Sequence, residues 1–468
     1  MKDLRSYLSS LRGKMADDLV EIDTEVDPLW EVSAITQKLE DRHQYPVLYF
    51  KKVKGSKIPV VTNIFASRRR CAQMLGASVE GVAAAYTQRL GRVVAPVYVE
   101  PKEAPIKQVI RRGADVDLFT LPVLTHHAWD AGPYITAGMV TMRWQVEGHV
   151  YNTGLYRCYV KEPRRMGIFL SPGKHNWHMV RESGAKGEAA RVIVWIGHHP
   201  EVYFGAQARN PFFQDDYSFT SGFIGEPLRL TASETWGRDF LVPADAEIAI
   251  EGTIPANVME VEAPFGEYTR YYGEQRYNPV IEVSAVTHRR EAIYHDIFVA
   301  HPDNQIFGSF AIEDKVFKAV REVVPNVKNV YLPLSGCGRF LCYISIGKRI
   351  EGEGKLALSA ALPVDTRVKY LVVVDEDINV FNEAEVLWAV ATRTKMPDDL
   401  IFVTNTIGEA LDPMAEGDNL INKMGIDATR PLSPFAERVS IPKEALERVR
   451  LEDFVPAGKL STVPIEKS

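Results

Sequence analysis

The chain has 468 residues, of which 46% are hydrophobic and 25% are charged. This balance is that of a globular protein of about three domains, and it excludes a disordered or fibrous chain. The 55 basic and 61 acidic residues give a formal net charge of −6, which argues against nucleic-acid binding because that needs a concentrated basic surface. The basic run at 68–70 is interpreted as a solvated helix face.

The cysteines are too few and too scattered for a disulfide framework, so we expect reduced packing residues at Cys71, Cys158, Cys337 and Cys342. No apolar run approaches the roughly 18 residues that a membrane helix needs. The N-terminus begins with charged, helix-like sequence and has no apolar signal-peptide core. We therefore expect a cytoplasmic protein without a membrane association.

The first hundred residues are expected to form a mixed α/β unit. Apolar residues recur at helical spacing and predict one buried helix face, formed by Leu29, Val32, Ile35 and Leu39. Two β-rich runs follow at 46–50 and 58–62, joined by a turn at 54–56. A helical stretch at 81–90 closes the unit, and residues 95–105 are interpreted as a linker.

From about residue 115 the sequence changes to many short strand-like runs. They lie at 137–144, 150–160, 167–170, 192–197, 247–251, 279–287 and 293–299, with one helix candidate at 177–182. Short strands separated by Gly, Pro and Asn signals indicate a barrel or a sandwich. The alternating acidic and apolar residues at the start of 115–127 fit a strand that enters this domain.

The last 150 residues alternate strands with helices, which indicates an α/β domain. Strands are expected at 327–332, 340–346, 370–374 and 400–403, and helices at 354–361 and 382–394. The second helix should turn Ala384, Val386, Leu387 and Val390 inward. The acidic residues at 375–377 follow a strand, where they could bind a ligand or cap the next helix.

One polar cluster within strand-like sequence is Asn152 to Arg157, followed by Lys174 and His175. An amide oxygen and an imidazole nitrogen can both bind a divalent cation such as Mn²⁺. The alternative is structural: Asn152 completes a turn and His175 caps the following helix.

A second cluster contains Glu262 and Glu267, separated by Pro264 and Gly266. Pro and Gly exclude a regular helix, so both carboxylates lie on a loop that can direct them at one point. Of two carboxylates near one cation, the one paired to the cation stays ionised and the other can carry a proton. Arg157 is the candidate cation, and a solvated acidic loop is the alternative.

Several segments in order resemble the UbiD family of prenylated-FMN-dependent decarboxylases over nearly the whole chain. They are 115–127, 152–157 with His175, 262–267, 373–379 followed by 387–393, and 423–429. The resemblance implies an α/β and α+β multidomain fold: an N-terminal α/β domain (1–110), a central flavin-binding split β-barrel (111–310) and a C-terminal α/β domain (311–468). The C-terminal segment would dimerise, giving a homodimer or a hexamer built as a trimer of dimers.

The resemblance also implies the residues of the site. The family's catalytic arginine and two acids fall on Arg157, Glu262 and Glu267. Its metal ligands fall on Asn152 and His175, with Asp216 as the third, where the family has a glutamate before a tyrosine and this chain has Asp216 before Tyr217. The cofactor should contact Asn152, Thr153, Gly154, Leu155, Tyr156, Arg157, Lys174 and His175, and Gly154 permits close backbone approach.

The implied reaction is a reversible, non-oxidative decarboxylation that uses prenylated FMN, Mn²⁺ and K⁺, with a flavin prenyltransferase as the cofactor's supplier. Arg157 would hold the substrate carboxylate, Glu262 would hold Arg157, and Glu267 would protonate the carbon that loses CO₂. Polar pocket candidates favour an aromatic or heteroaromatic acid with a second polar substituent over an α,β-unsaturated acid of the cinnamate kind. They are His126, His127, His295, His301 and Gln305.

Two other classes of function remain open. One is a non-catalytic flavin-binding partner subunit of a multi-subunit aromatic carboxylase, against which the complete set of Arg157, Glu262 and Glu267 argues. The other is a conventional flavin oxidoreductase, which no dinucleotide-binding motif supports.

Overall fold

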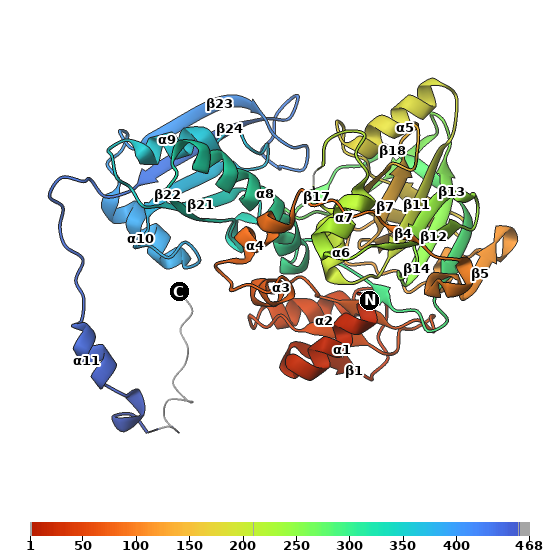
Figure 1. The fold of residues 1–468 in the computed structure, drawn as a ribbon, viewed down its shortest axis with the longest axis horizontal. Coiled ribbons are helices and arrows are strands. Elements are labelled where there is room, and N and C mark those ends of the chain that lie inside the picture. The colour runs from red at the N-terminus through yellow and green to blue at the C-terminus, as the bar shows by residue number, and fades with distance from the viewer. Residues whose placement is uncertain (1, 209, 457, 459–468) are drawn as a thin grey trace.

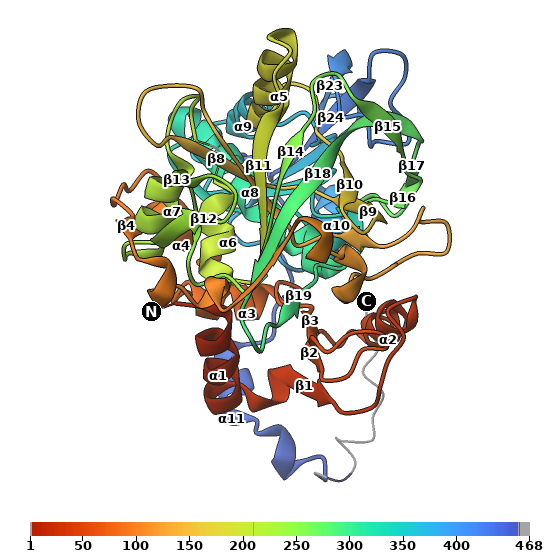
Figure 2. The ribbon, with the colours of Figure 1, turned by 90° about the vertical axis from the view of Figure 1, so that its right-hand side faces the viewer.

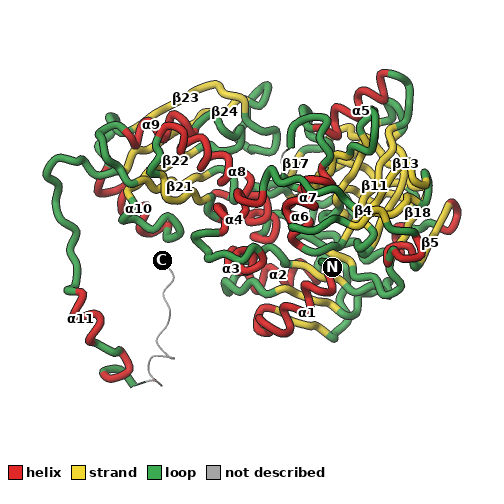
Figure 3. Tube along the Cα trace, viewed as in Figure 1, coloured by secondary structure: helices red, strands yellow, loops and turns green. Residues whose placement is uncertain are grey.

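The computed structural model describes residues 2–208, 210–456 and 458. It confirms a mixed α/β and α+β chain with several sheets. In Figure 1 the N-terminal elements lie beneath a large central sheet, and the C-terminal sheet lies beside both. Figure 3 shows strands concentrated in the central part and helices mostly at its borders. Among the described residues, none of the helices combines the length and apolar character needed to cross a membrane.

The N-terminal part contains four helices and a small sheet, and the last of these helices packs on the first helix of the C-terminal part. The helices are α1 (Leu4–Lys14), α2 (Glu31–Glu40), α3 (Arg68–Met74) and α4 (Val82–Arg89), and the sheet order is β1 (Leu19–Ile22), β2 (Val47–Phe50), β3 (Val60–Thr62) and β19 (Tyr294–His295). Strand β19 runs parallel to β3, so the only strand within the predicted run at 293–299 joins this sheet and ties the N-terminal part to the central chain, as Figure 2 shows.

Two expectations for the N-terminal part are wrong. Leu29 precedes α2 and is 46% exposed, because Trp30 takes a left-handed backbone conformation at the start of the helix. The basic run lies on α3, but it is no solvated face: Arg70 is buried and donates to the carbonyls of Ile64 and Asn63, and Arg68 pairs with Glu313. Buried guanidinium groups of this kind keep their charge only because each has acceptors.

The central part is built on a ten-stranded antiparallel sheet. Its order is β6 (Tyr134–Ile135), β9 (Cys158–Glu162), β10 (Arg165–Ile168), β18 (Arg276–His288), β14 (Ile248–Ile254), β11 (Ala190–Ile196), β7 (Met139–Arg143) and β8 (Tyr151–Leu155), with β15 (Met259–Glu262) and β5 (Val109–Arg112) added to β18. Within the described chain the end strands β6 and β8 do not pair, so the sheet stays open.

Smaller elements surround this sheet. They are a sheet of β13 (Gly237–Pro243), β12 (Arg229–Ser233) and β4 (Val97–Tyr98), the pair β16 (Phe265–Gly266) and β17 (Tyr272–Gly273), and the helices α5 (His175–Ala185), α6 (Pro200–Ala206) and α7 (Asp216–Ile224). The expected linker at 95–105 therefore contributes a strand. The predicted single run at 150–160 is two strands, β8 and β9, that break at Tyr156 and Arg157.

One further expectation for the central part fails, and two helices there were not foreseen. The segment at 115–127 contains no strand, but begins with short 3₁₀ turns at Gly113–Asp115 and Leu118–Thr120. Helices α6 and α7 were not predicted, because both are buried on nearly all sides and so lack a one-sided apolar pattern.

The C-terminal part begins with the long helix α8 (Pro302–Val323), which the sequence pattern did not predict. Its sheet has the order β20 (Val327–Tyr331), β21 (Leu341–Ile346), β22 (Tyr370–Asp375), β24 (Leu420–Ala428) and β23 (Leu400–Ile407), flanked by α9 (Glu353–Ala361) and α10 (Glu383–Arg393). Leu387 on α10 was expected to face inward but is 59% exposed. A last helix, α11 (Lys443–Arg448), lies away from the folded body in Figure 1.

Two smaller expectations are settled by contacts. Asp375 and Asp377 both pair with Arg393 of α10, so this acidic run is structural. The four cysteines are free, with Cys71, Cys158 and Cys342 buried and Cys337 half-buried. The domain boundaries at 110 and 310 stay a prediction.

Candidate active site

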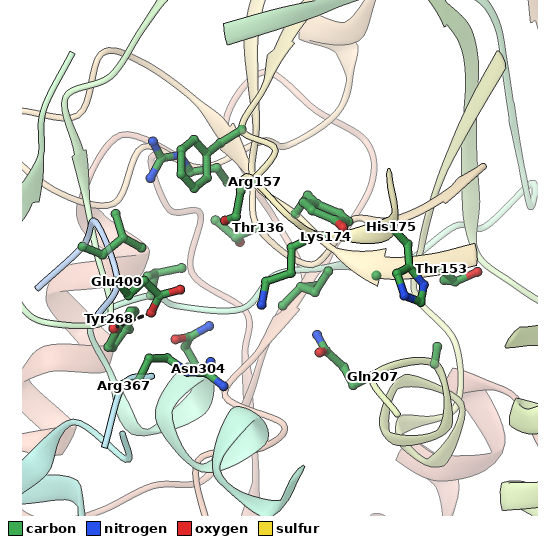
Figure 4. A pocket seen from close by; sticks show the side chains of 18 of the residues that line it. Thr136, Thr153, Arg157, Lys174, His175, Gln207, Tyr268, Asn304, Arg367 and Glu409 are labelled. Carbon is green, nitrogen blue, oxygen red and sulfur yellow. Dashed lines mark hydrogen bonds between the residues drawn. The ribbon is translucent and has the colours of Figure 1, made fainter. Parts of the chain in front are cut away.

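A cavity of about 490 Å³ lies between the central sheet and loops of the C-terminal part. Figure 4 shows its residues, with Thr153, His175 and Gln207 at one end and Tyr268, Arg367 and Glu409 at the other. We call the first end the cofactor wall (residues 152–157, Lys174, His175, Gln207, Asn210 and Asp216) and the second the distal wall (Tyr268, Asn304, Arg339, Arg367 and Glu409).

Arg157 lies where β8 and β9 break apart, and a buried carboxylate holds it from behind. Its Nε donates to Oε1 of Glu262 at 3.0 Å and its Nη2 donates to Oε2 at 2.9 Å. Asn278 also donates to Glu262 Oε2 at 2.7 Å. Such a bidentate pair fixes both the charge and the plane of the guanidinium.

The remaining nitrogen of Arg157, Nη1, meets the carboxylate of Glu267. The guanidinium also lies near two aromatic rings, 4.5 Å from the centre of Phe169 and 4.8 Å from that of Phe265. Arg157, Glu262 and Glu267 are therefore brought together in one nearly dry cluster, and both Arg157 and Glu267 line the cavity.

The loop that carries the two acids is held by a second set of contacts. Glu262 ends β15, where it pairs with β18, and Glu267 follows β16. The Gly266 amide donates to Asp130 at 2.8 Å, and the Ala131 amide donates to the Pro264 carbonyl at 2.9 Å. A Cβ at Gly266 would come within 2.3 Å of the His127 ring, so the loop can approach this closely only with glycine there.

On the cofactor wall, Asn152 and His175 meet. Asn152 Oδ1 lies 2.7 Å from His175 Nδ1. The Asn152 amide nitrogen donates to buried Asn176 at 2.7 Å, which donates in turn to the Val140 carbonyl, so the oxygen of Asn152 faces the imidazole. Burial, then the nearby positive His178 and Lys174, lowers the pKa of His175, which favours the neutral form that binds metals.

Asp216, the first residue of α7, lies against the same strand. Its two oxygens accept from the Thr153 amide and from the Asn210 side chain, each at 2.7 Å. Burial raises the pKa of Asp216 to about 7. Within the described residues, no cluster of three or more His, Cys, Asp or Glu side chains suits a metal ion. A ligand set of Asn152, His175 and Asp216 contains only two residues of these types.

Some of the other predicted residues line the cavity and others do not. Residues of the cofactor wall named from the sequence line the cavity, namely Thr153, Gly154, Leu155, Tyr156 and Lys174. The five polar pocket candidates are absent from its described lining. His126 is buried against Asp296, His301 caps α8, and Gln305 donates to the Tyr268 carbonyl, so these groups are used in packing, as is His295, which is fully buried.

Sequence reasoning missed the whole distal wall and also Asn176. Arg339, Arg367 and Glu409 come from three separate loops of the C-terminal part, and each is surrounded in sequence by ordinary loop residues. No local spacing in the sequence predicts that these three residues come together. For Asn176 the available signal is its position directly after His175; the structure adds that its amide is fully buried and therefore needs specific partners.

Together the fold and the cavity define a class: a multidomain α/β enzyme whose site sets an arginine between two acids. The sequence matches three profiles of 3-octaprenyl-4-hydroxybenzoate carboxy-lyase (UbiD): the N-terminal domain at 12–90, the Rift-related domain at 97–302 and the C-terminal domain at 305–428. The anhydromevalonate phosphate decarboxylase of Methanosarcina mazei is 34% identical over 437 residues, covering 92% of this chain and 98% of that protein.

Two structures of the UbiD-class enzyme HmfF from Pelotomaculum thermopropionicum are also similar. The one in complex with FMN has a TM-score of 0.90 and 40% identity, and covers 97% of this chain and 100% of that one. An evolved dimeric form in complex with prFMN has a TM-score of 0.88 and 39% identity, with the same coverage. The chain belongs to the UbiD family, and it is a carboxy-lyase.

Proposed function

We propose that the chain catalyses the reversible, non-oxidative decarboxylation of an aromatic or heteroaromatic acid, or of an α,β-unsaturated acid, with prenylated FMN, Mn²⁺ and K⁺. The observation that carries the proposal is the cluster at the cavity, where Arg157 is held by Glu262 and also meets Glu267. One arginine and two acids can bind a carboxylate and deliver a proton at the same place.

The residues of the cofactor wall fit a flavin phosphate and its cation. Two ligands on adjacent positions of one octahedral cation, with bonds of about 2.1 Å, lie about 3 Å apart, and the facing atoms of Asn152 and His175 are 2.7 Å apart. We propose Asp216 as the third ligand, since its carboxylate lies on the amide of the residue after Asn152. Lys174 lines the same cavity and supplies positive charge for a phosphate.

When bound, the cofactor supplies the electron sink that an sp² carbon needs as its carboxylate leaves. The chain's own residues do the rest. Arg157 binds the substrate carboxylate, Glu262 keeps the guanidinium oriented, and Phe169 and Phe265 exclude water from it. Glu267 delivers a proton to the carbon that lost CO₂. In the carboxylation direction the same carboxylate removes that proton.

The substrate is the less constrained part of the proposal. A polar distal wall supports a substrate with a second polar substituent, as the sequence had suggested from other residues. The relative from Methanosarcina mazei is named for an unsaturated, phosphorylated acid. Anhydromevalonate phosphate is therefore the second candidate substrate, beside aromatic and heteroaromatic acids.

We also propose that the chain forms a homodimer or a hexamer through its C-terminal segment. In that segment Val439, Ile441 and Phe454 are 95%, 64% and 71% exposed, although all three are hydrophobic. The segment runs outside the folded body in Figure 1. A second copy that covers these side chains would account for them, and light scattering on the full chain measures the assembly directly.

The deciding experiment is expression with and without a flavin prenyltransferase. Without it, the protein should fold but release no CO₂ from a panel of aromatic and unsaturated acids. With it, the protein should carry a mass and a visible spectrum consistent with prenylated FMN and should decarboxylate at least one acid. Full activity in a host that lacks any flavin prenyltransferase would contradict the proposal, and NAD(P)H oxidation would instead favour an oxidoreductase.

A further inference from the structure

Two of the arginines that line the cavity are each held by a buried carboxylate. At the distal wall, Arg367 Nε donates to Asp365 Oδ1 at 2.8 Å and Nη2 donates to Oδ2 at 2.9 Å. Asp365 is 4% exposed. As in the pair of Arg157 and Glu262, the carboxylate holds the guanidinium from one side. Nη1 of Arg367 donates to no group in the described part of the chain.

A second guanidinium lies on the same wall. Arg339 is 6% exposed, and its nitrogens donate to the backbone carbonyls of Gln305, Gly338 and Asn304. Among the described residues, no carboxylate comes within 4.0 Å of it. Burial, followed by the nearby positive Arg367, lowers the pKa of Arg339 to about 10, so it is still charged at neutral pH.

The residues around Arg339 leave space for its guanidinium group. Gly308 on α8 leaves the space that the guanidinium fills, because a Cβ there would overlap Nη2. The Tyr268 ring lies 5.6 Å from the guanidinium carbon. Placing a charge at a buried site without a carboxylate partner is costly unless another anion completes the site.

The charge of Arg339 is offset only at a distance, by the carboxylates of Glu409 and Asp365. The carboxylate of Glu409 already accepts a hydrogen bond from the Tyr268 hydroxyl at 2.9 Å. Asn304 points its amide into the cavity in Figure 4 and can donate. Two guanidiniums and two carboxylates thus balance in charge, and Arg367 Nη1 and the Asn304 amide are donors left at the cavity without an acceptor in the described part of the chain. Charge-assisted bonds from arginine are the usual means of binding carboxylate and phosphate.

We propose that the distal wall binds a second anionic group of the substrate, a carboxylate or a phosphate, through Arg367, Arg339 and Asn304. The inference rests on the proposed function, since it assumes that Arg157 binds the carboxylate that is lost. The substrate is then a dianion, with the carboxylate that it loses bound to Arg157 and its second anionic group bound to the distal wall. A neutral hydroxyl or methyl group at that end binds less well.

The test uses cofactor-loaded enzyme and two matched pairs of acids. One pair is terephthalate and benzoate, and the other is anhydromevalonate phosphate and anhydromevalonate. KM and kcat are measured where CO₂ is released, and inhibition constants where it is not. Within at least one pair the dianion should bind 10- to 100-fold more tightly, which is the range of about 1.5–3 kcal/mol for a charged hydrogen bond. The pair that shows the preference identifies carboxylate or phosphate.

Two variants assign the preference to the distal wall. Arg367→Gln should reduce the dianion-to-monoanion ratio of kcat/KM by about 10- to 100-fold. Arg367→Gln leaves Asp365 buried without its partner, so a second variant is needed that breaks no ion pair. Asn304→Asp adds a repelling carboxylate to the distal wall and should lower the same ratio. Arg349→Gln, at an arginine that is 60% exposed in its side chain, is the control and should leave the ratio unchanged.

Equal binding of dianion and monoanion, or a ratio that neither variant changes, overturns the inference while the decarboxylase proposal stands. A preference that survives Arg367→Gln and Asn304→Asp assigns the second anion to another wall and also overturns it. If the loaded enzyme neither decarboxylates nor is inhibited by any acid, the proposed function itself fails.

Discussion

The two walls of the cavity differ in how the sequence encodes them. The cofactor wall comes mostly from one stretch of 24 residues, with Asn152 on β8, Arg157 between β8 and β9, and His175 at the start of α5. The distal wall comes from the start of α8, which carries Asn304, and from loops between residues 268 and 409. A wall built from one local unit keeps its geometry by itself, whereas a wall built from distant loops depends on how the domains pack.

Several contacts at and near the distal wall join the central part of the chain to the C-terminal part. Besides its bond to Glu409, Tyr268 packs its ring against Phe340 at 5.9 Å, and its carbonyl accepts from Gln305 at 3.1 Å. Arg276 donates to the Ala410 carbonyl at 3.5 Å. We therefore expect mutations on the cofactor wall to affect chemistry or cofactor binding, and mutations on the distal wall to affect substrate binding.

The largest effect should come from Glu267→Gln, which keeps the shape but removes the proton. Turnover should fall at least ~10²-fold, as is typical when a general acid is lost. Exchange of solvent hydrogen into the decarboxylated product requires the same proton donor and no CO₂, so it should disappear too. Glu260→Gln is the matched control, because Glu260 pairs with Lys161 and Arg165 outside the cavity. Exchange at the wild-type rate in Glu267→Gln would exclude Glu267 as the donor.

Glu262→Gln should also reduce turnover, but through Arg157. Removing one partner of a buried ion pair leaves the other charge unbalanced, at a cost of about 3–5 kcal/mol. Arg157 should then hold the carboxylate poorly, so KM rises as well as kcat falling. Product exchange, which needs no carboxylate, should decline less than in Glu267→Gln. An equal loss of exchange in both variants would contradict separate roles for the two acids.

The next largest effect should come from Asn152→Ala and His175→Ala, each of which should lose Mn²⁺ and cofactor together. The cation links protein to phosphate, and a buried phosphate needs its charge neutralised. Metal analysis and the flavin spectrum of the purified variants measure both. His178→Ala is the control, one turn further along α5 and exposed. If Asp216→Ala keeps full metal occupancy, the third ligand lies elsewhere at 214–222.

The parts of the molecule that the sequence predicted are again those encoded by neighbouring residues. The arginine and the two acids, the Asn152–His175 pair and most strands are encoded by local patterns and by motif order. The break between β8 and β9 at Arg157 was not predicted, because its residues read as one continuous strand. Only tertiary packing shows that the chain leaves the sheet there.

The failures have a common cause. Helices α6 and α7 are buried on nearly every side, and α8 carries both polar and apolar residues in its buried set. Periodicity detects a one-sided helix, so it detects none of these. Likewise the histidines at 126, 295 and 301 looked like pocket residues because they are polar. In the structure they are buried in packing contacts, while the polar groups at the cavity come from unremarkable loops.

A smaller effect should come from Tyr268→Phe, which removes one hydrogen bond within the distal wall. Loss of the bond to Glu409 should cost about 1 kcal/mol. The Glu409 carboxylate is then held less firmly and can compete with the substrate for the neighbouring guanidiniums. We expect KM to rise by about 3- to 10-fold with kcat nearly unchanged. A fall in kcat without a change in KM would mean that Tyr268 acts on the chemical step instead.

The smallest effect concerns stability and pH, and it tests the start of α8, the helix that carries Asn304 of the distal wall. Asp303, in the first turn of α8, accepts from the amides of Asn63 and Phe65 at 3.0 and 2.6 Å. Burial, assisted by the negative Asp296, raises the pKa of Asp303 from 3.8 to about 7.

Between about pH 4 and pH 7 the folded chain therefore binds a proton at Asp303 that the unfolded chain has released. The free energy of unfolding should consequently decrease as pH rises through this window, by at most ~1.4 kcal/mol per pH unit from this one group. Asp303→Asn cannot release that proton, so the decrease should be shallower in the variant. Urea unfolding at pH 5, 6, 7 and 8 measures both slopes, and parallel slopes for the two proteins would exclude Asp303 as the titrating group.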